Sequence, residues 1–331
     1  MIKLGVTRLE QLRQRRIQTL MGGTRYVSLR LLEELGTIPE SEANQLFPVV
    51  TKRLTNSAGA FRRTDPERFD TLNAELMNFL AAHRDRVGGL RVHDAAVADG
   101  TTALALYRSF LEAGIQLDSY LATDLCDYVV QIDRGGSGPL VFLDPTTNSI
   151  LQVHWQNFVF NFPKGENPFW YPVNGLVRNL LMRFPVRRLL EDWKSGEVGK
   201  GARVELLHPA VLNEVASPSV FFFRREDLFN EQSTPVDFVR AMNVLNRSYF
   251  SEAQLERAVR SLARPLELGG YLLIGGDSEK PGETAATLFR RTDSSLVPET
   301  RWSGGAPVES LVTGVELSSV GAKGTERPDC A

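Results

Sequence analysis

The sequence predicts an α/β protein whose central sheet is doubly wound and mostly parallel. Three observations support this prediction. Short apolar runs of strand length alternate with helical patterns from residue 90 onward, a turn of small residues follows the first run, and a carboxylate ends the second. Strands that alternate with helices favour parallel pairing, because each helix returns the chain to the same end of the sheet.

Length and composition narrow the class of protein. The chain has 331 residues, of which 42% are hydrophobic and 24% charged, and its net charge is only −2. These values are ordinary for a globular protein of more than one domain and do not indicate a nucleic-acid partner. Cys126 and Cys330 lie far apart without metal-ligand spacing, so we expect neither a disulfide framework nor a metal site.

The N-terminal residues lack the apolar core of a signal peptide, and no stretch approaches the roughly 20 apolar residues that span a bilayer. We therefore expect a cytoplasmic protein without a transmembrane segment. The first 30 residues nevertheless carry seven basic side chains against Glu10 alone. Such a run leaves a weak possibility of contact with a membrane surface, although a solvated helix face is its commoner meaning.

Residues 1–85 are expected to form an N-terminal helical cap. Leucines and isoleucines recur there at helical spacing, and glycines interrupt the pattern. A last helix begins with Asp65 as N-cap and Pro66 in its first turn, and it runs to Leu80. The stripes consist of Leu9, Leu12, Ile17 and Leu20, and of Leu31, Leu32 and Leu35.

Residues 86–126 and 204–318 carry the strand and helix alternation of the main domain. Strands are expected at 90–93, 120–123, 219–224, 236–241 and 271–274, with helices at 101–113 and 251–262. Two final strands near 286–291 and 309–315 are expected to form an antiparallel C-terminal hairpin. Residues 319–331 are expected to be a disordered tail.

Between these parts, residues 127–203 break the alternation. Three short strands at 128–132, 140–143 and 150–154 predict an inserted β-meander. A basic amphipathic helix over 173–193 follows, with a kink expected at Pro185. We interpret this helix as an ordinary lid over the substrate, with a position on a membrane surface as the alternative.

The turn from Asp94 to Gly100 has the character of a glycine-rich loop in which alanines occupy two positions. Small side chains at Ala96 and Ala98 allow a ligand to approach the backbone. Asp124 ends the next strand about 25 residues later, where a carboxylate can accept hydrogen bonds from a ribose diol. Asp227 ends the following strand near the expected place of an adenine. This combination predicts a Rossmann-like sheet that binds a nucleoside-bearing cofactor.

These residues resemble the class I S-adenosylmethionine-dependent methyltransferases, and within them the CheR-type group that methylates chemotaxis receptors. Small residues at 95, 96, 98 and 100 resemble the first motif of the family, and residues 122–124 resemble its ribose motif. Residues 243–250 and 254–275 are similar to its later segments. The resemblance covers roughly 50–125 and 219–275 and implies S-adenosylmethionine as the cofactor.

The resemblance also implies the site residues. Arg62 or Arg63 corresponds to an arginine near the cofactor carboxylate, and Asn243 and Tyr249 are expected on the acceptor side. The candidate cofactor-binding residues are Arg62, Arg63, Asp94, Ala96, Ala98, Asp99, Gly100, Asp124, Asp227, Leu228, Asn243 and Val244.

Two departures from the family pattern bear on the function. Thr101 and Thr102 replace an acidic pair that can hold the cofactor's ammonium group, and Asp99 is a substitute one position earlier. Residues 127–203 have no counterpart in the receptor methyltransferases, which argues against a chemotaxis role. Asp94 and Asp99 also have a plainer interpretation as helix caps, and Asp227 as a turn residue.

The chemistry expected is methyl transfer by in-line displacement to a small molecule or a protein side chain. Such a reaction needs alignment and exclusion of water more than it needs a base. His154 is a candidate base for a hydroxyl or amine acceptor, although a packed histidine is its commoner meaning. The alternatives are a catalytically inactive binding protein of the same fold and a dehydrogenase, which the missing Gly-x-Gly-x-x-Gly spacing disfavours.

Overall fold

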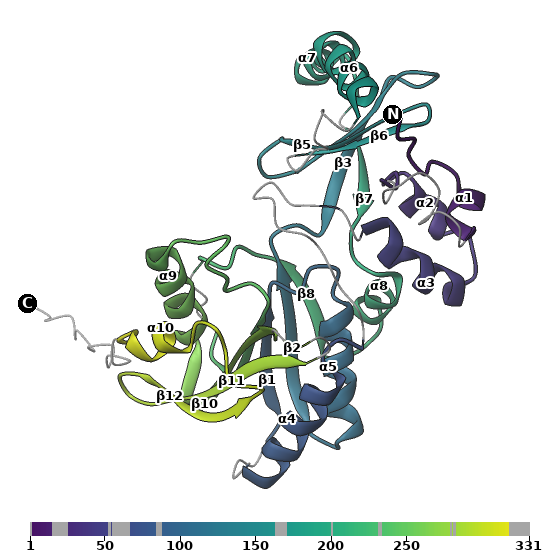
Figure 1. The fold of residues 1–331 in the computed structure, drawn as a ribbon. Coiled ribbons are helices and arrows are strands. Elements are labelled where there is room, and N and C mark those ends of the chain that lie inside the picture. Colours follow the sequence, from purple (N-terminus) through teal and green to yellow (C-terminus); the bar gives the residue numbers. More distant parts are fainter. Residues whose placement is uncertain are drawn as a thin grey trace, which may run out of the picture. The chain divides into compact units, whose positions relative to one another are not determined.

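The computed structural model describes residues 2–14, 26–51, 54, 67–83, 88–162, 171–199, 201–230, 234–278, 280 and 283–317. The chain forms two compact units (Figure 1). The meander unit comprises 1–68, 97–106 and 124–219, and the parallel-sheet unit comprises 69–96, 107–123 and 220–331. The expectations for Ile17, Leu20, Asp65, Pro66 and the C-terminal tail lie outside the described residues.

The parallel-sheet unit is built on a seven-stranded sheet with the order β12-β11-β10-β9-β1-β2-β8. Strand β1 pairs in parallel with β2 and with β9, and β9 pairs in parallel with β10, whereas β10, β11 and β12 are antiparallel. The predicted fold class is therefore confirmed. The strands are β1 Leu90–Ala95, β2 Leu117–Asp124, β8 Phe221–Arg225, β9 Val236–Met242, β10 Leu266–Asp277, β11 Thr284–Arg291 and β12 Leu296–Trp302.

Helices α4 (Asp70–His83), α5 (Thr101–Glu112) and α9 (Glu252–Ala263) accompany this sheet. The α9 helix begins where its sequence predicts, because Ser251 and Gln254 form a capping box that satisfies the first free amides. Its buried face packs with apolar residues of β9 and β10 into one core. The α5 helix begins in the meander unit and ends in the parallel-sheet unit.

The C-terminal hairpin differs from the prediction in its second strand. Strand β11 pairs with β12, and the residues expected as that strand form helix α10 (Glu309–Gly314). The apolar residues Val308, Val312 and Val315 lie at helical spacing and pack into the core, so burial outweighs their β-branched preference. Strand β12 is not predicted, because Pro298 interrupts its pattern. An edge strand tolerates a proline where the register shifts, as it does here between Leu288 and Phe289.

The meander unit contains a five-stranded antiparallel sheet with the order β6-β5-β4-β3-β7. The inserted β-meander is thus present, with two strands more than the sequence predicted. Short helices belong to the same unit, whereas α4 of the predicted cap belongs to the parallel-sheet unit. The elements are β3 Tyr128–Ile132, β4 Leu140–Leu143, β5 Ile150–Trp155, β6 Phe158–Asn161, β7 Ala202–Glu205, α1 Leu9–Arg13, α2 Leu31–Leu35, α3 Glu40–Thr51 and α8 Pro209–Ala216.

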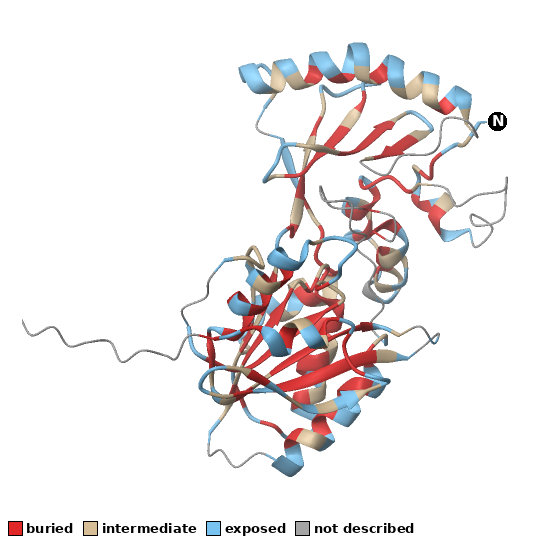
Figure 2. Cartoon of the chain, turned by 60° about the vertical axis from the view of Figure 1, so that its left-hand side comes forward, coloured by how far each residue is buried: buried red, intermediate tan, exposed pale blue. Residues whose placement is uncertain are grey.

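A helical segment lies along this sheet and buries one side against it (Figure 2). It consists of α6 (Pro172–Leu181), one π-helical stretch (Met182–Val186) and α7 (Arg187–Ser195). Pro185 lies inside the π-helical stretch, where the backbone accommodates the missing amide donor. The wider turn places Val186 in the core five residues after Leu181, so the buried stripe continues across the proline.

Side chains, rather than a strand ladder, fasten residues 26–30 to β5. The Gln152 amide accepts a hydrogen bond from Leu29 N at 2.7 Å and donates to the carbonyl of Val27 at 3.0 Å. It also donates to Asn161 Oδ1 at 2.7 Å. Ser28 bonds His154 Nδ1 at 2.8 Å. Because Gln152 is 1% exposed, all three of its bonds form away from water.

We predict that Gln152→Leu lowers the free energy of unfolding by roughly 2–4 kcal/mol, because it leaves buried backbone groups of residues 27 and 29 without their partner. The matched control is Gln131→Leu on strand β3 of the same sheet, where the amide donates one longer bond of 3.3 Å to Asp133. Urea unfolding followed by circular dichroism measures both. Equal losses in the two variants would contradict the role given to Gln152.

Candidate functional site

The order of strands in the parallel sheet reverses between β1 and β9. From β1 the chain proceeds to β2 and β8 on one side, and it then crosses to β9 and β10 on the other. In open α/β sheets such a reversal leaves a crevice at the carboxyl ends of the two strands, and ligands bind there. The candidate site therefore lies where β1 ends at Ala95 and β9 ends at Met242.

Both strands lead directly into a left-handed residue. Ala96 has φ 58° and Asn243 has φ 57°. Non-glycine residues rarely adopt this conformation, which costs alanine roughly 1–2 kcal/mol. The Asn243 side chain is fixed at the end of β10, since its Oδ1 accepts a hydrogen bond from Asp277 N at 3.0 Å. A Cβ on Gly276 would lie 2.8 Å from that oxygen, which explains the glycine there.

The loop after Ala96 continues in the meander unit and orients Asp124. Ala98, also left-handed with φ 58°, donates its amide to Asp124 Oδ2 at 2.7 Å. Cys126 N donates to Asp124 Oδ1 at 3.0 Å. Two backbone amides thus hold the carboxylate from which the sequence predicts ribose binding. Gly100 follows with φ 81°, and a Cβ there would lie 2.9 Å from Val211 Cγ1 on α8.

Asp99 serves the start of α5. Its Oδ1 accepts hydrogen bonds from the backbone amide of Thr101, at 3.0 Å, and from the Thr101 hydroxyl. The residue is only 1% exposed, and its carbonyl accepts from His208 N at 3.0 Å. These contacts form a turn directly before α5. Its role toward a cofactor ammonium group remains a prediction.

Asp94, another candidate ligand, belongs to a buried ion pair. Its Oδ1 accepts from Arg240 Nε at 2.8 Å, and its Oδ2 accepts from Arg240 Nη2 and from the Tyr120 hydroxyl at 2.7 Å. Burial alone would lower the pKa of Arg240, but the Asp94 carboxylate outweighs it and the pKa is raised. Burial, and then the charge of Asp94, raise the pKa of Tyr120.

Neither Arg240 nor Tyr120 is among the site residues predicted from the sequence. A signal was present, because Arg240 interrupts the apolar residues 238–242 of β9, all of which are buried. A buried arginine needs a carboxylate partner, and Asp94 is its register neighbour on β1. Asp94 therefore positions the strands around the crevice, and its direct role toward a cofactor stays untested.

His93, next to Asp94, forms a second buried contact between β1 and β2. Its Nε2 lies 2.9 Å from Thr123 Oγ1 at the end of β2. Burial lowers the pKa of His93 to about 4, since the opposing influence of Asp94 is weaker and Arg224 lowers it further. The imidazole is therefore neutral at physiological pH.

The remaining residues predicted for the site differ in their surroundings. Asp227 follows β8 and accepts from Phe229 N at 3.0 Å, which is the geometry of a turn. Leu228 and Val244 pack against the apolar core. Tyr249 is 40% exposed. Arg62 and Arg63 lie outside the described residues.

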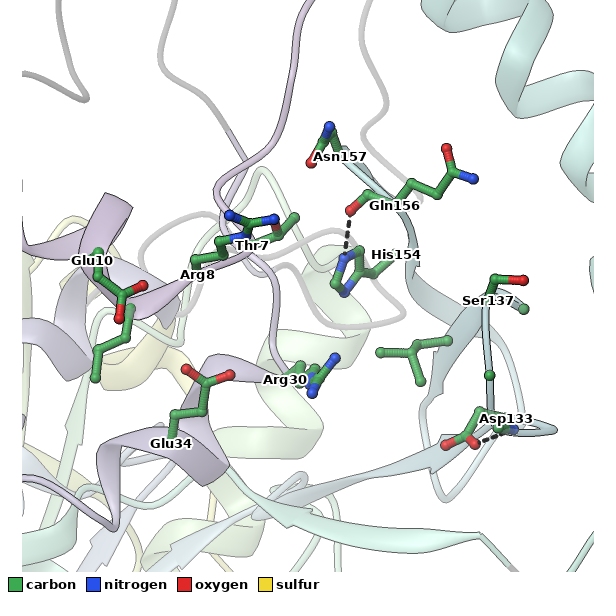
Figure 3. Close-up of a pocket in the computed structure, with 15 residues that line it drawn as sticks. Thr7, Arg8, Glu10, Arg30, Glu34, Asp133, Ser137, His154, Gln156 and Asn157 are labelled. Atoms are coloured by element: carbon green, nitrogen blue, oxygen red, sulfur yellow. Dashed lines mark hydrogen bonds between the residues drawn. The ribbon is translucent and has the colours of Figure 1, made fainter.

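A separate pocket of about 640 Å³ opens within the meander unit (Figure 3). Arg8 and Arg30 line it together with Glu10 and Glu34. His154 also lines it, but Ser28 engages its Nδ1 and the Gln156 carbonyl engages its Nε2 at 3.0 Å. Burial lowers the pKa of His154, so its ring is neutral and held in place, as expected for a packed histidine.

No family model and no curated protein matches the chain. Solved structures with a similar fold include an S-adenosylmethionine-dependent methyltransferase from Mesorhizobium loti, with 12% identity and a TM-score of 0.27 over 60% of this chain and 52% of that one. Another is the magnesium protoporphyrin IX methyltransferase from Synechocystis PCC 6803 with bound SAH, with 10% identity and a TM-score of 0.29 over 65% of this chain and 58% of that one.

A third is an amino pentose methyltransferase from Micromonospora echinaspora with bound SAM, with 13% identity and a TM-score of 0.28 over 70% of this chain and 65% of that one. The match thus spans less than two thirds of each neighbour's length. Likenesses with such low TM-scores do not identify the reaction of this chain.

We predict that Arg240→Met lowers the free energy of unfolding by about 3–5 kcal/mol, because it leaves the Asp94 carboxylate buried without its counter-charge. The double variant Asp94→Leu/Arg240→Met should lose less than the sum of the two single variants, since it removes both charges. Urea unfolding of all four proteins gives the coupling energy. Strictly additive losses would contradict the ion pair.

A second prediction concerns pH. The pKa of His93 falls from its ordinary 6.5 to about 4 on folding, so the unfolded chain binds more protons between these values. The free energy of unfolding should therefore decrease by up to roughly 3 kcal/mol as the pH drops from 6.5 to 4. His93→Gln should remove this part of the decrease, whereas His83→Gln, at an exposed site on α4, should retain it. Urea titrations across this pH range measure the slopes, and an unchanged slope in His93→Gln would refute the assignment.

Proposed function

We propose that the chain is an S-adenosylmethionine-dependent methyltransferase that acts on a small-molecule or protein side-chain acceptor. The observation that supports this most is the reversal of strand order between β1 and β9, where both strands end in left-handed turns. A second observation is that a loop of small residues orients the acid at the end of β2. In an open α/β sheet, the crevice at a reversal of strand order is where a nucleoside binds.

The residues present fit such a cofactor. Ala96, Ala98 and Gly100 add at most a methyl group each, which lets a ligand approach their backbone. Asp124 would accept hydrogen bonds from the ribose hydroxyls, and it is already held by two amides. Asp227 would lie toward the adenine. Asp94 would act indirectly, by fixing β1 against β9 through Arg240.

When bound, the cofactor would supply an electrophilic methyl group on a sulfonium. The chain's own task would be to align an acceptor with that group and to exclude water. We propose Asn243, fixed by Asp277, and the exposed Tyr249 as residues of the acceptor side. Residues 86–126 and 204–318 would form the cofactor domain, and 127–203 would recognise the acceptor. The CheR-type subgroup is part of this proposal.

A second candidate is a binding protein that holds the cofactor without turnover. The observation that favours it concerns the first turn of α5. Thr101 and Thr102 stand where the resemblance implies an acidic pair, and the nearby Asp99 carboxylate is engaged by Thr101. An ammonium group would then need other acceptors, such as backbone carbonyls.

Isothermal titration calorimetry with S-adenosylmethionine, S-adenosylhomocysteine and NAD tests the proposed cofactor. We expect the first two to bind and Asp124→Ala to weaken them roughly 10- to 100-fold, because charge-assisted hydrogen bonds to the ribose are lost. Asp118→Ala is the matched control, since Asp118 is an exposed aspartate near the other end of β2. Binding of NAD alone, or equal affinity in both variants, would overturn the assignment.

Turnover then separates the two candidates. Cell extract incubated with the protein and cofactor carrying a radiolabelled methyl group should acquire label in one size class of molecule. Asp124→Ala should not transfer label at the same cofactor concentration. Tight binding without any labelled product would favour the non-catalytic candidate.

A further inference from the structure

The helical segment over 172–195 leaves the side away from its sheet exposed (Figure 2), and four apolar residues occupy exposed positions on it. Leu176, Leu180 and Phe184 are 60%, 51% and 61% exposed, and Val173 is 37% exposed. We refer to these four residues as the outer ridge. They recur at helical spacing, and the opposite stripe already forms a core with β4 and β5, so packing within the meander unit does not explain them.

The exposed charges on the same segment are mainly positive. Arg183, Arg187, Arg188 and Lys194 are exposed. The exposed carboxylate of Glu191 is paired with Arg187 at 2.8 Å, and Asp192 is mostly buried and paired with Arg134. Among the described residues, no carboxylate pairs with Arg183 or Arg188. The segment therefore presents long apolar side chains beside a surplus of cations.

The N-terminal chain lies beside α6 at Asn174, a buried residue of that helix. Lys3 N donates to Asn174 Oδ1 at 2.9 Å, and the Asn174 side chain donates to the Lys3 carbonyl at 2.7 Å, which fastens the chain to the first turn of α6. The Lys3 ammonium lies 4.8 Å and 5.4 Å from the ring centres of Tyr26 and Tyr171.

We propose that the outer ridge and its flanking arginines bind the surface of an anionic lipid bilayer. An amphipathic helix lies in the interface when its apolar side chains enter the headgroup region and its cations contact anionic lipids. Both features are present here. Within the part of the chain that the structure describes, no helix is long and apolar enough to cross a membrane, so the contact would be superficial.

Charge favours a lipid surface over a second copy of the chain. A homodimeric contact through this segment would bring the arginines of two copies together, and like charges in one interface cost binding energy. An anionic bilayer instead complements them. The π-helical stretch supports the same view, because it keeps Val186 in the core while Phe184, directly before Pro185, remains exposed. The proposal does not depend on the methyltransferase assignment.

Co-sedimentation of the full chain with vesicles tests the proposal. We expect binding to phosphatidylcholine vesicles that contain about a third of phosphatidylglycerol, weak binding to pure phosphatidylcholine, and release at roughly 0.5 M salt. Leu176→Gln/Leu180→Gln/Phe184→Gln should weaken binding at least about tenfold, because the apolar insertion is lost. Arg183→Gln/Arg187→Gln/Arg188→Gln should weaken it and reduce its salt dependence.

Leu268→Gln is the matched control, since Leu268 is 54% exposed on β10 in the parallel-sheet unit and should leave binding unchanged. Circular dichroism verifies that each variant is folded, which is expected because every substituted side chain is exposed. No binding of the wild-type chain to anionic vesicles would overturn the proposal. So would equal losses in the control and the ridge variant, or self-association abolished by the ridge substitutions in place of vesicle binding.

Discussion

The geometry of the parallel-sheet unit depends on one buried interaction, the ion pair of Asp94 and Arg240. The two residues are register neighbours on β1 and β9, and the Tyr120 hydroxyl on β2 completes the contact. Removing both charges from water is costly, so the pair is tolerated only with good hydrogen-bond geometry. That requirement fixes three adjacent strands in a single register, and with them the positions of the turns that follow.

A second pair acts at the other ends of the same strands. Arg91 donates to Asp237 from Nε at 2.9 Å and from Nη2 at 3.0 Å, and its backbone amide donates to the same carboxylate. The Asp237 carboxylate is buried in this contact, whereas the Arg91 side chain remains partly exposed. Strands β1 and β9 are therefore held together at both ends. The geometry of the crevice at their carboxyl ends thus depends on these side-chain pairs as well as on the loops.

The sequence predicts the repetitive part of this architecture and misses what depends on long-range packing. Alternating patterns and the cap at Ser251 locate α9 and the central strands, because these signals are local. The sequence predicts a strand at 309–315 where the structure has a helix, because burial of Val312 decides the conformation and the local pattern does not show it. Similarly, a carboxylate at the end of a strand is predicted as a cofactor ligand when its buried counter-charge cannot be identified from the sequence. Asp94 turns inward because of Arg240, which is 146 residues away in the chain, whereas Asp124 lies beside the small-residue loop as expected.

The alanines of that loop have a consequence for any molecule that binds there. Glycine would adopt the left-handed turns at 96 and 98 without strain, but it would also leave the loop many alternative shapes. Alanine has far fewer accessible backbone conformations. Most of the loop's conformational entropy is therefore lost when the chain folds, and little remains to be lost when a ligand binds. Preorganisation of this kind favours tight binding at little further cost, and it makes the loop a rigid template rather than an adaptable one.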